Sequence, residues 1–316
     1  MSHGLDVVTI GEAMALFVAD DFGPLSRVRS FTKRVAGAEL NVAIGLSRLG
    51  LKVGWVSRVG EDSFGKLVLD TLAAECVDDV CVTVDPRHPT AMMLKSKTSD
   101  GSDPKIEYFR KGSAASTLSI TDFAADYVLS ARHLHLTGIT PALSETAREL
   151  SFHAARTMHA ARKPISFDPN LRLSLWRSSA EMIHTLNDLA SHADIVMPGL
   201  GEGSILTGYD TPEEIAGFYL DRGANLVVVK LGQHGAYFRT RDEAKTIPAC
   251  PVAKVIDTVG AGDGFAVGVI SGLLEGLGVE EAVARGNWIG SLAVQVIGDS
   301  EGLPTRASLP GHTAAV

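Results

Sequence analysis

The chain has 316 residues, which is enough for one large α/β domain or two smaller ones. With 45% hydrophobic and 21% charged residues, its composition is typical of a globular protein that buries a sizeable core. Acidic residues (37) outnumber lysines and arginines (29), and the resulting net charge of -8 argues against a general nucleic-acid or anionic-membrane surface.

The cysteines and the apolar stretches exclude further classes of protein. Cys76, Cys81 and Cys250 are odd in number and lack Cys-x-x-Cys spacing, so they predict neither a disulfide framework nor a thiolate zinc site. The first residues lack the basic segment and apolar run of a signal peptide, and the apolar stretch 265–274 is too short to cross a bilayer. We therefore expect a cytoplasmic protein with no membrane or nucleic-acid partner.

Short β-rich runs alternate with helical patterns along most of the chain. Strands are predicted over 6–11, 53–59, 133–138, 164–168, 194–197 and 225–231. Helices are predicted over 41–49, 64–74, 144–161, 180–192 and 212–220. This alternation indicates an α/β fold with a doubly wound, mainly parallel sheet covered by helices on both faces. Ligands of such sheets bind beyond the carboxyl ends of the strands.

Two segments, about 13–36 and 90–110, interrupt the alternation. The first contains two extended runs around an FGPL turn, and the second contains AMMLKSK and KIEYFR, joined by a polar turn at 99–104. The four extended pieces are predicted to pair into a small second sheet that forms a lid over a sugar-sized cleft. Two unrelated surface hairpins are the alternative.

The segment DTVGAGDGF at 257–265 is the most informative in the chain. Gly260, Ala261 and Gly262 precede a helical pattern, and small residues at a helix start let backbone N–H groups point at an anion. Asp263 follows at once, and a carboxylate beside an anion site is explained if it accepts the proton of an attacking hydroxyl.

Other interpretations of this glycine segment remain open at this point. It could be a structural turn in which Asp263 caps the helix. A dinucleotide loop G-x-G-x-x-G is not matched, because Phe265 stands where the third glycine belongs. The phosphate loop G-x-x-x-x-G-K-[ST] is also absent from the sequence.

DTVGAGDGF resembles the C-terminal signature of the ribokinase-type (PfkB) carbohydrate kinases, and the resemblance extends over about 7–309. It implies one ribokinase-like domain over 1–316, in which Gly260, Ala261 and Gly262 form an anion hole and Asp263 is the catalytic base. GAELNVAIGLSRLG at 37–50 resembles the N-terminal signature of the family, which implies that Gly37 and Asn41 contact the sugar. Ala36 departs from the family pattern, where a second glycine is usual.

The same resemblance implies where ATP binds. KLGQHGA at 230–236 is similar to the K-x-G-x-x-G loop of the family, so Lys230, Gly232 and Gly235 are expected to contact the nucleotide together with Gly260 and Gly262. Asn287, on a late helix, is expected near the adenine. For Gln233 and His234 individually, an ordinary hairpin turn before 236–240 remains a reasonable alternative.

Two metal ions are implied by the family. Glu202 matches the glutamate of an N-x-x-E motif that holds Mg²⁺ through water, although Gly199 replaces the asparagine. A monovalent cation, possible as K⁺, is expected near Asp257 by family analogy alone.

The expected acceptor follows from basic residues near the lid. Arg110 and Arg172 could hold a planar carboxylate, which a neutral hexose does not carry. Their segments resemble the 2-keto-3-deoxygluconate kinases of the family, which implies that Tyr108, Arg110 and Arg172 bind a sugar acid phosphorylated on its primary hydroxyl. Met93 lies in a lid strand where those kinases commonly carry a tyrosine. Because of this departure, a related sugar acid remains an alternative substrate.

Alternatives to this function come from other classes of protein. A fructokinase or ribokinase of the same family, a non-catalytic sugar or nucleotide sensor, and a nicotinamide-dependent dehydrogenase all remain open. His133 and His135 share one face of a predicted strand, where a packed or hydrogen-bonded role competes with metal binding. An edge strand of the lid also offers a surface for a homodimer or higher homo-oligomer.

Overall fold

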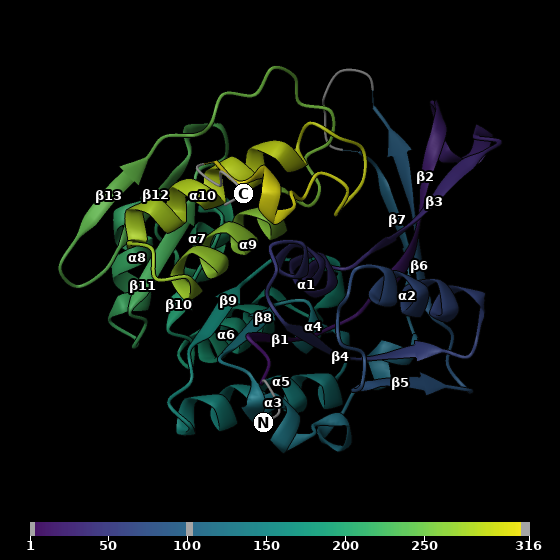
Figure 1. The fold of residues 1–316 in the computed structure, drawn as a ribbon, viewed down its shortest axis with the longest axis horizontal. Coiled ribbons are helices and arrows are strands. Elements are labelled where there is room, and N and C mark those ends of the chain that lie inside the picture. The colour runs from purple at the N-terminus through teal and green to yellow at the C-terminus, as the bar shows by residue number, and fades with distance from the viewer. Residues whose placement is uncertain (1–3, 99–103, 311–316) are drawn as a thin grey trace, which may run out of the picture.

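A nine-stranded sheet forms the centre of the computed structural model, which describes residues 4–98 and 104–310 (Figure 1). Its strands are β1 (Val7–Ile10), β4 (Val53–Gly60), β5 (Val82–Asp85), β8 (His133–Thr137), β9 (Ile165–Asp168), β10 (Ile195–Val196), β11 (Leu226–Lys230), β12 (Ala236–Arg239) and β13 (Ala244–Ile247). Their order is β13-β12-β11-β10-β9-β8-β1-β4-β5, and all pairs are parallel except the antiparallel pairs β11–β12 and β12–β13. The predicted doubly wound, mainly parallel sheet is therefore confirmed.

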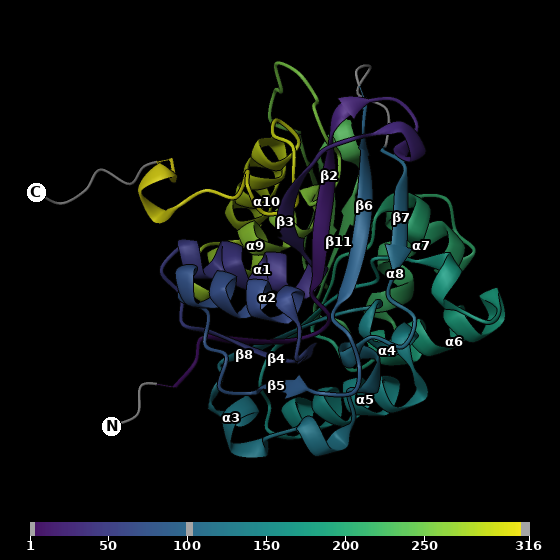
Figure 2. The ribbon, with the colours of Figure 1, turned by 90° about the vertical axis from the view of Figure 1, so that its right-hand side faces the viewer.

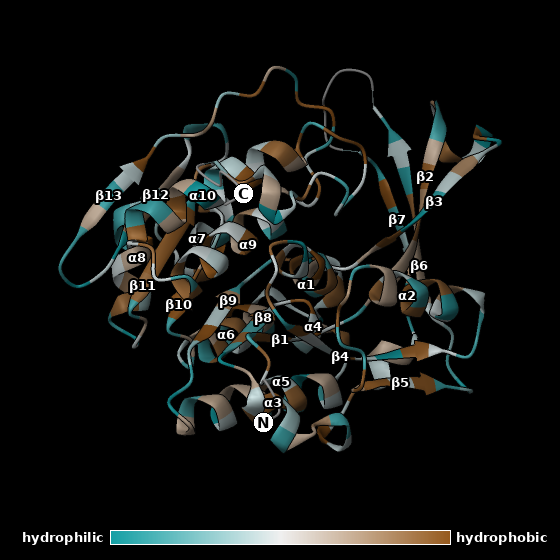
Figure 3. Cartoon of the chain, in the orientation of Figure 1, coloured by the Kyte–Doolittle hydropathy of each residue, from teal (hydrophilic) through white to brown (hydrophobic). Residues whose placement is uncertain are grey.

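Helices cover both faces of this sheet. They are α1 (Ala38–Arg48), α2 (Ser63–Ala74), α3 (Ala125–Ser130), α4 (Thr140–Leu143), α5 (Glu145–Ala160), α6 (Ser179–Ala190), α7 (Leu200–Thr207), α8 (Pro212–Leu220), α9 (Ala261–Leu274) and α10 (Val279–Ala293). One buried apolar cluster includes residues of α5, α6 and α8, and another includes residues of α1, α9 and α10. Figure 3 marks hydrophobic residues along strands of the large sheet and hydrophilic ones on the outer turns.

The strand order reverses next to β1, and this reversal positions the site. From β1 the chain proceeds to β4 and β5 on one side, and from β8 through β11 on the other. Parallel sheets open a crevice at such a point, beyond the carboxyl ends of their strands. α1 follows the lid hairpin into this crevice, and α4 begins just after β8.

A second, four-stranded sheet is built from the two interrupting segments. It contains β2 (Met14–Phe22), β3 (Phe31–Ala36), β6 (Ala91–Lys97) and β7 (Ile106–Phe109) in the order β3-β2-β6-β7. β2 and β6 pair in parallel, which joins the two segments and rules out unrelated hairpins. Figure 2 shows the strands of this sheet rising past α1 and α2. The predicted lid sheet is therefore present, although the turn predicted at 99–104 lies mostly outside the described residues.

The lid turns one apolar face inward. Met14, Leu16, Val18, Ala91 and Met93 form its own buried cluster.

Among the described residues, none of the helices is both long and apolar enough to span a bilayer. The homo-oligomer through the lid stays a prediction.

Candidate active site

Two cavities meet at the start of α9. The lid-side cavity has a volume of about 420 Å³, and the second, beside α10, has about 750 Å³, both within the size range of small-molecule sites. Lys230, Thr258 and Gly262 line both cavities, so two ligands bound there would face each other across the loop that begins α9.

The start of α9 has the geometry of an anion-binding site. Gly260 caps the helix with a φ of 82°, and a Cβ at this position would lie 2.2 Å from the carbonyl oxygen of Asp299. The backbone N–H groups of Ala261, Gly262 and Asp263 belong to the first helical turn, which has no carbonyl partners within the helix. These donors and the helix dipole favour a negative charge at the point where the two cavities meet.

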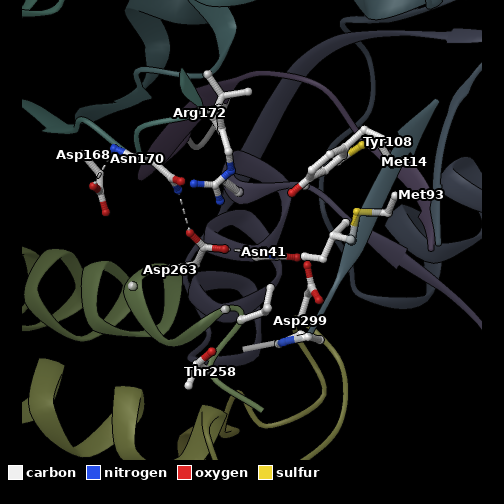
Figure 4. Close-up of a pocket in the computed structure, with 18 of the residues that line it drawn as sticks. Met14, Asn41, Met93, Tyr108, Asp168, Asn170, Arg172, Thr258, Asp263 and Asp299 are labelled. Carbon is white, nitrogen blue, oxygen red and sulfur yellow. Dashed lines mark hydrogen bonds between the residues drawn. The ribbon is translucent and has the colours of Figure 1, made fainter. Parts of the chain in front are cut away.

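Asp263 projects from this first turn into the lid-side cavity, as Figure 4 shows. Asn41 Nδ2 donates to its Oδ2 (2.8 Å), and Asn170 Nδ2 donates to its Oδ1 (3.4 Å). Burial, together with the charges of Asp168 and Asp299, raises the pKa of Asp263 to about 7 against the lowering effect of the Asn41 hydrogen bond. A carboxylate with a pKa near neutrality suits a general base.

Predicted acceptor-binding residues gather around the same cavity. Gly37, Asn41, Tyr108, Arg110 and Arg172 all line it. Figure 4 shows Tyr108 and Arg172 directed into the space in front of Asp263. Arg172 Nη1 also donates to the carbonyl oxygen of Leu171 (3.0 Å), which fixes the arginine against its own loop.

Arg110 differs from Arg172, because its guanidinium already has a buried carboxylate partner. Its Nη2 lies 2.5 Å from Glu12 Oε2, and its Nε donates to the same oxygen (2.7 Å). Ser113 Oγ donates to the other oxygen of Glu12. The guanidinium also lies 5.6 Å from the centroid of the Tyr108 ring. Arg110 therefore connects lid residue Tyr108 to the buried Glu12. Arg172 is the better placed of the two arginines to contact a ligand.

Residues predicted to bind nucleotide line the second cavity. Gly232, Gly235, Gly262, Lys230 and Asn287 are among them, and Val255, Phe265 and Val294 add apolar surface. Gly235 has a φ of 90°, and a Cβ there would lie 2.0 Å from the carbonyl oxygen of Ile247. Asn287 Nδ2 donates to the carbonyl oxygens of Ile247 (3.1 Å) and Pro248 (3.0 Å), so its amide nitrogen holds the cavity wall.

Lys230 lies between the two cavities and keeps its charge. Burial lowers its pKa, but the carboxylates of Asp168 and Glu202 outweigh this effect, and the net shift is upward. Its Nζ donates to Asp168 Oδ2 (2.6 Å). The ammonium is thus held at the junction of the two cavities, where the phosphate chain of a bound nucleotide would extend from one cavity into the other.

Carboxylates near Lys230 fit a magnesium ion held through water. Glu202 and Asp168 both line the lid-side cavity. Glu202 also caps α7, where it accepts the N–H groups of Gly199 (2.7 Å) and Leu171 (2.8 Å). Two carboxylates suit Mg²⁺, since this ion usually keeps several waters and binds phosphates together with one or two carboxylates.

The residues around Asp257 do not fit the expected potassium ion. The Nζ of Lys95, a buried residue of lid strand β6, lies 2.5 Å from Asp257 Oδ2. It also donates to Asp299 Oδ1 (3.1 Å). The cation that pairs with Asp257 is therefore the ammonium group of Lys95.

Several site residues escaped the sequence analysis. Asp168 ends a predicted strand and Asn170 follows it, at the carboxyl end where the fold class already places ligands, so both could have been found. Lys95 shares a strand face with Ala91 and Met93, and a charge on an apolar face is a signal of a buried partner. Glu12 and Asp299 carried no such signal.

The histidine pair on β8 has a packed, hydrogen-bonded role. His133 Nε2 and His135 Nδ1 each lie 2.8 Å from Ser166 Oγ. Burial lowers the pKa of each to about 3, so both rings are neutral.

An anion-binding helix start between two cavities, with a buried carboxylate beside it, is the arrangement expected of an enzyme that transfers a phosphoryl group between two bound ligands. The family model described as pfkB family carbohydrate kinase matches residues 5–306. The chain therefore belongs to the pfkB family of carbohydrate kinases.

Individual relatives agree with this assignment. A 2-dehydro-3-deoxygluconokinase of Bacillus subtilis is 51% identical over 98% of this chain and 96% of its own. The crystal structure of a PfkB protein from Polaromonas sp. JS666 has a TM-score of 0.89 and 53% identity, covering 96% of this chain and 98% of its own. A fructokinase double mutant of Vibrio cholerae, solved with fructose, ADP and potassium, has a TM-score of 0.83 and 29% identity, covering 97% and 98%. An ATP-dependent carbohydrate kinase is thus supported over a dehydrogenase.

Proposed function

We propose that this kinase transfers the γ-phosphoryl group of ATP to the primary hydroxyl of 2-keto-3-deoxygluconate or a close sugar acid. The observation that carries the proposal is the position of Asp263, buried beside the anion-binding start of α9 and facing the lid-side cavity. The relative of 51% identity carries the name of this activity. 2-Keto-3-deoxygluconate and 2-dehydro-3-deoxygluconate are the same compound.

The chemistry assigned to the chain needs a base and a charge-stabilising pocket. Asp263 accepts the proton of the acceptor hydroxyl. At the same time the hydroxyl oxygen of the acceptor forms a bond to the γ-phosphorus, and the bond from that phosphorus to the bridging oxygen of ADP breaks. Gly260, Ala261 and Gly262, at the start of α9, are assigned to the anion hole that stabilises the charge developing on the transferred group. Lys230 neutralises charge on the phosphates from between the cavities.

Magnesium, when bound with ATP, would neutralise phosphate charge and align the transferred group. Glu202 and Asp168 would hold it through water, and the Gly199 cap of α7 orients the Glu202 carboxylate. The apolar wall of the second cavity suits an adenine ring, with Asn287 and Gly235 shaping that wall.

A carboxylate on the acceptor suits the guanidinium of Arg172. An arginine binds a planar carboxylate with two parallel hydrogen bonds, and Tyr108 can donate from the opposite lid strand. Gly37 and Asn41 at the start of α1 are assigned to the hydroxyls of the sugar. Arg110 acts indirectly, through the ion pair that holds the lid base.

Two measurements test these assignments. In an assay that couples ADP release to a signal, 2-keto-3-deoxygluconate should give a higher kcat/KM than fructose, ribose or adenosine. Arg172→Ala should raise the KM for the sugar acid, while the exposed Arg177→Ala serves as the control. Equal turnover of fructose, together with an unchanged Arg172→Ala, would reject the sugar-acid acceptor.

The base is tested separately. Asp263→Asn should lose about 10²–10⁴-fold in turnover, the usual contribution of a general base, with ATP binding retained. Near-normal turnover in this variant would contradict the assignment. The absence of acceptor-dependent ATP consumption across the whole panel would favour a sensor instead.

A further inference from the structure

A lysine of the lid reaches the base of the anion-binding loop. Lys95 lies on β6, and its Nζ contacts Asp257 Oδ2 (2.5 Å) and Asp299 Oδ1 (3.1 Å). All three side chains are buried. Burying an ammonium is unfavourable unless carboxylates compensate its charge, and here two carboxylates do so.

Asp257 connects the two backbone segments that shape the anion-binding loop. Its Oδ1 accepts the N–H of Val259 (3.2 Å), one residue before Gly260. Its Oδ2 accepts the N–H of Gly298 (3.2 Å), next to Asp299. The ammonium therefore sits at the junction of both segments.

The second carboxylate extends this junction to the helix start itself. The carbonyl oxygen of Asp299 packs so closely over Gly260 that a Cβ there would lie 2.2 Å away. A shift of the segment around Asp299 would thus move the residue that caps α9. Any cation that fixes Asp257 against Asp299 fixes the position of the anion-binding N–H groups.

The contacts of Lys95 also speak against a free monovalent ion at the same carboxylate. Asp257 Oδ2 already has an ammonium at contact distance and a backbone N–H donor. A potassium ion at this oxygen would meet the positive charge of Lys95 in a buried environment, where repulsion is strong. An ammonium carries the same single charge as potassium and donates to the same kind of oxygen ligands.

We propose that the ammonium of Lys95 is a tethered cation that takes the place of a monovalent metal ion and positions the anion-binding loop for phosphoryl transfer. Lys95 is a positioning residue, since it acts through Asp257 and Asp299 and not on substrate. The proposal rests on the proposed phosphoryl transfer. It predicts a kinase whose turnover does not depend on potassium.

The first experiment compares the wild-type chain and Lys95→Met in potassium and in tetramethylammonium, a cation too large for the site. Wild-type turnover should be the same in both salts. Lys95→Met should lose about 10- to 100-fold in kcat in tetramethylammonium, as expected for a misplaced catalytic loop, with little change in KM for the acceptor. Potassium or ammonium ions should restore much of this loss.

Controls separate this role from a purely structural ion pair. Lys97→Met, on the same strand, removes a lysine that donates to the backbone carbonyl of Asp20 and should change neither kcat nor the salt response. A structural ion pair alone would give Lys95→Met a loss that no cation restores, and that result would overturn the proposal. Activation of the wild-type chain by potassium would overturn it as well.

Two further measurements keep the test decisive. If Lys95→Met does not fold, the double variant Lys95→Met/Asp299→Asn is compared with the wild type in its place. This double variant removes one charge of each sign. Thermal unfolding without any acceptor should show that potassium stabilises the Lys95→Met variant more than the wild type. Because this shift needs no turnover, it tests the cation site even if the acceptor assignment fails, and the absence of any shift would contradict the proposal.

Discussion

The buried carboxylate of Asp263 should make the folded protein less stable as the pH rises. Its pKa is raised from the ordinary carboxylate value to about 7, so the folded state holds this proton more tightly than the unfolded chain does. Between those two pKa values the folded state binds more protons, and stability falls with increasing pH by up to about 1.4 kcal/mol per pH unit. Above pH 7 the full penalty is present.

Asp263→Asn removes this dependence, because an amide does not ionise. Relative to the wild type, the variant should gain about 2–3 kcal/mol in free energy of unfolding between pH 5 and pH 8, with the gain levelling off above pH 7. The variant also changes the hydrogen bonds from Asn41 and Asn170, but that effect is the same at every pH and cancels in the comparison.

Urea unfolding of both proteins at a series of pH values measures the gap. Asp242→Asn, on an exposed turn, provides the control and should follow the wild type throughout. A gap between Asp263→Asn and the wild type that stays constant from pH 5 to pH 8 would refute the reasoning, because the carboxylate would then ionise as easily in the folded chain as in the unfolded one.

Three other predictions concern activity and packing. The kcat/KM for the acceptor should rise with pH to a plateau above about pH 7, since only the ionised Asp263 accepts a proton; a pH-rate profile without that rise would contradict its role as base. Gly260→Ala should lose turnover and about 1–3 kcal/mol of stability because of its φ of 82° and the carbonyl above it, whereas Gly276→Ala, at a φ of 84° with nothing within 4 Å, should lose less of both in activity and thermal-unfolding assays. Arg110→Ala should lose about 3–5 kcal/mol in urea unfolding because its buried carboxylate partner is left unpaired, and Arg172→Ala should keep most of the wild-type stability.

The sequence predicted the large sheet well because its strands are short, apolar and separated by helical patterns. The helix predicted over 212–220 matches α8 at both ends, where Thr211 caps the helix and Pro212 begins it. α3, α4, α7, β5 and β13 were missed, since each is short and has little periodicity of its own. The lid was predicted from its interruption of the alternation, but not the parallel register of β2 with β6.

In the site, local motifs were predicted and distant partners were not. Gly260 to Asp263 form one continuous segment whose residue types indicate an anion site directly. Arg110 was predicted to bind the acceptor, and its pairing with Glu12 depends on a contact between positions that are 98 residues apart. A sequence states which charges exist, but only the fold decides which of them neutralise one another.

The parallel pairing of β2 with β6 has a consequence for how the protein folds. The two strands flank β3, α1, β4, α2 and β5 in the sequence, so the lid forms only after a long loop has closed. During synthesis the β2–β3 hairpin emerges first and exposes one strand edge until β6 follows. We expect the amide protons of the β2–β6 pair to become protected later in refolding than those of the β1–β4 pair. The lid-side cavity would then receive its lid wall only after the β1–β4 pair has formed.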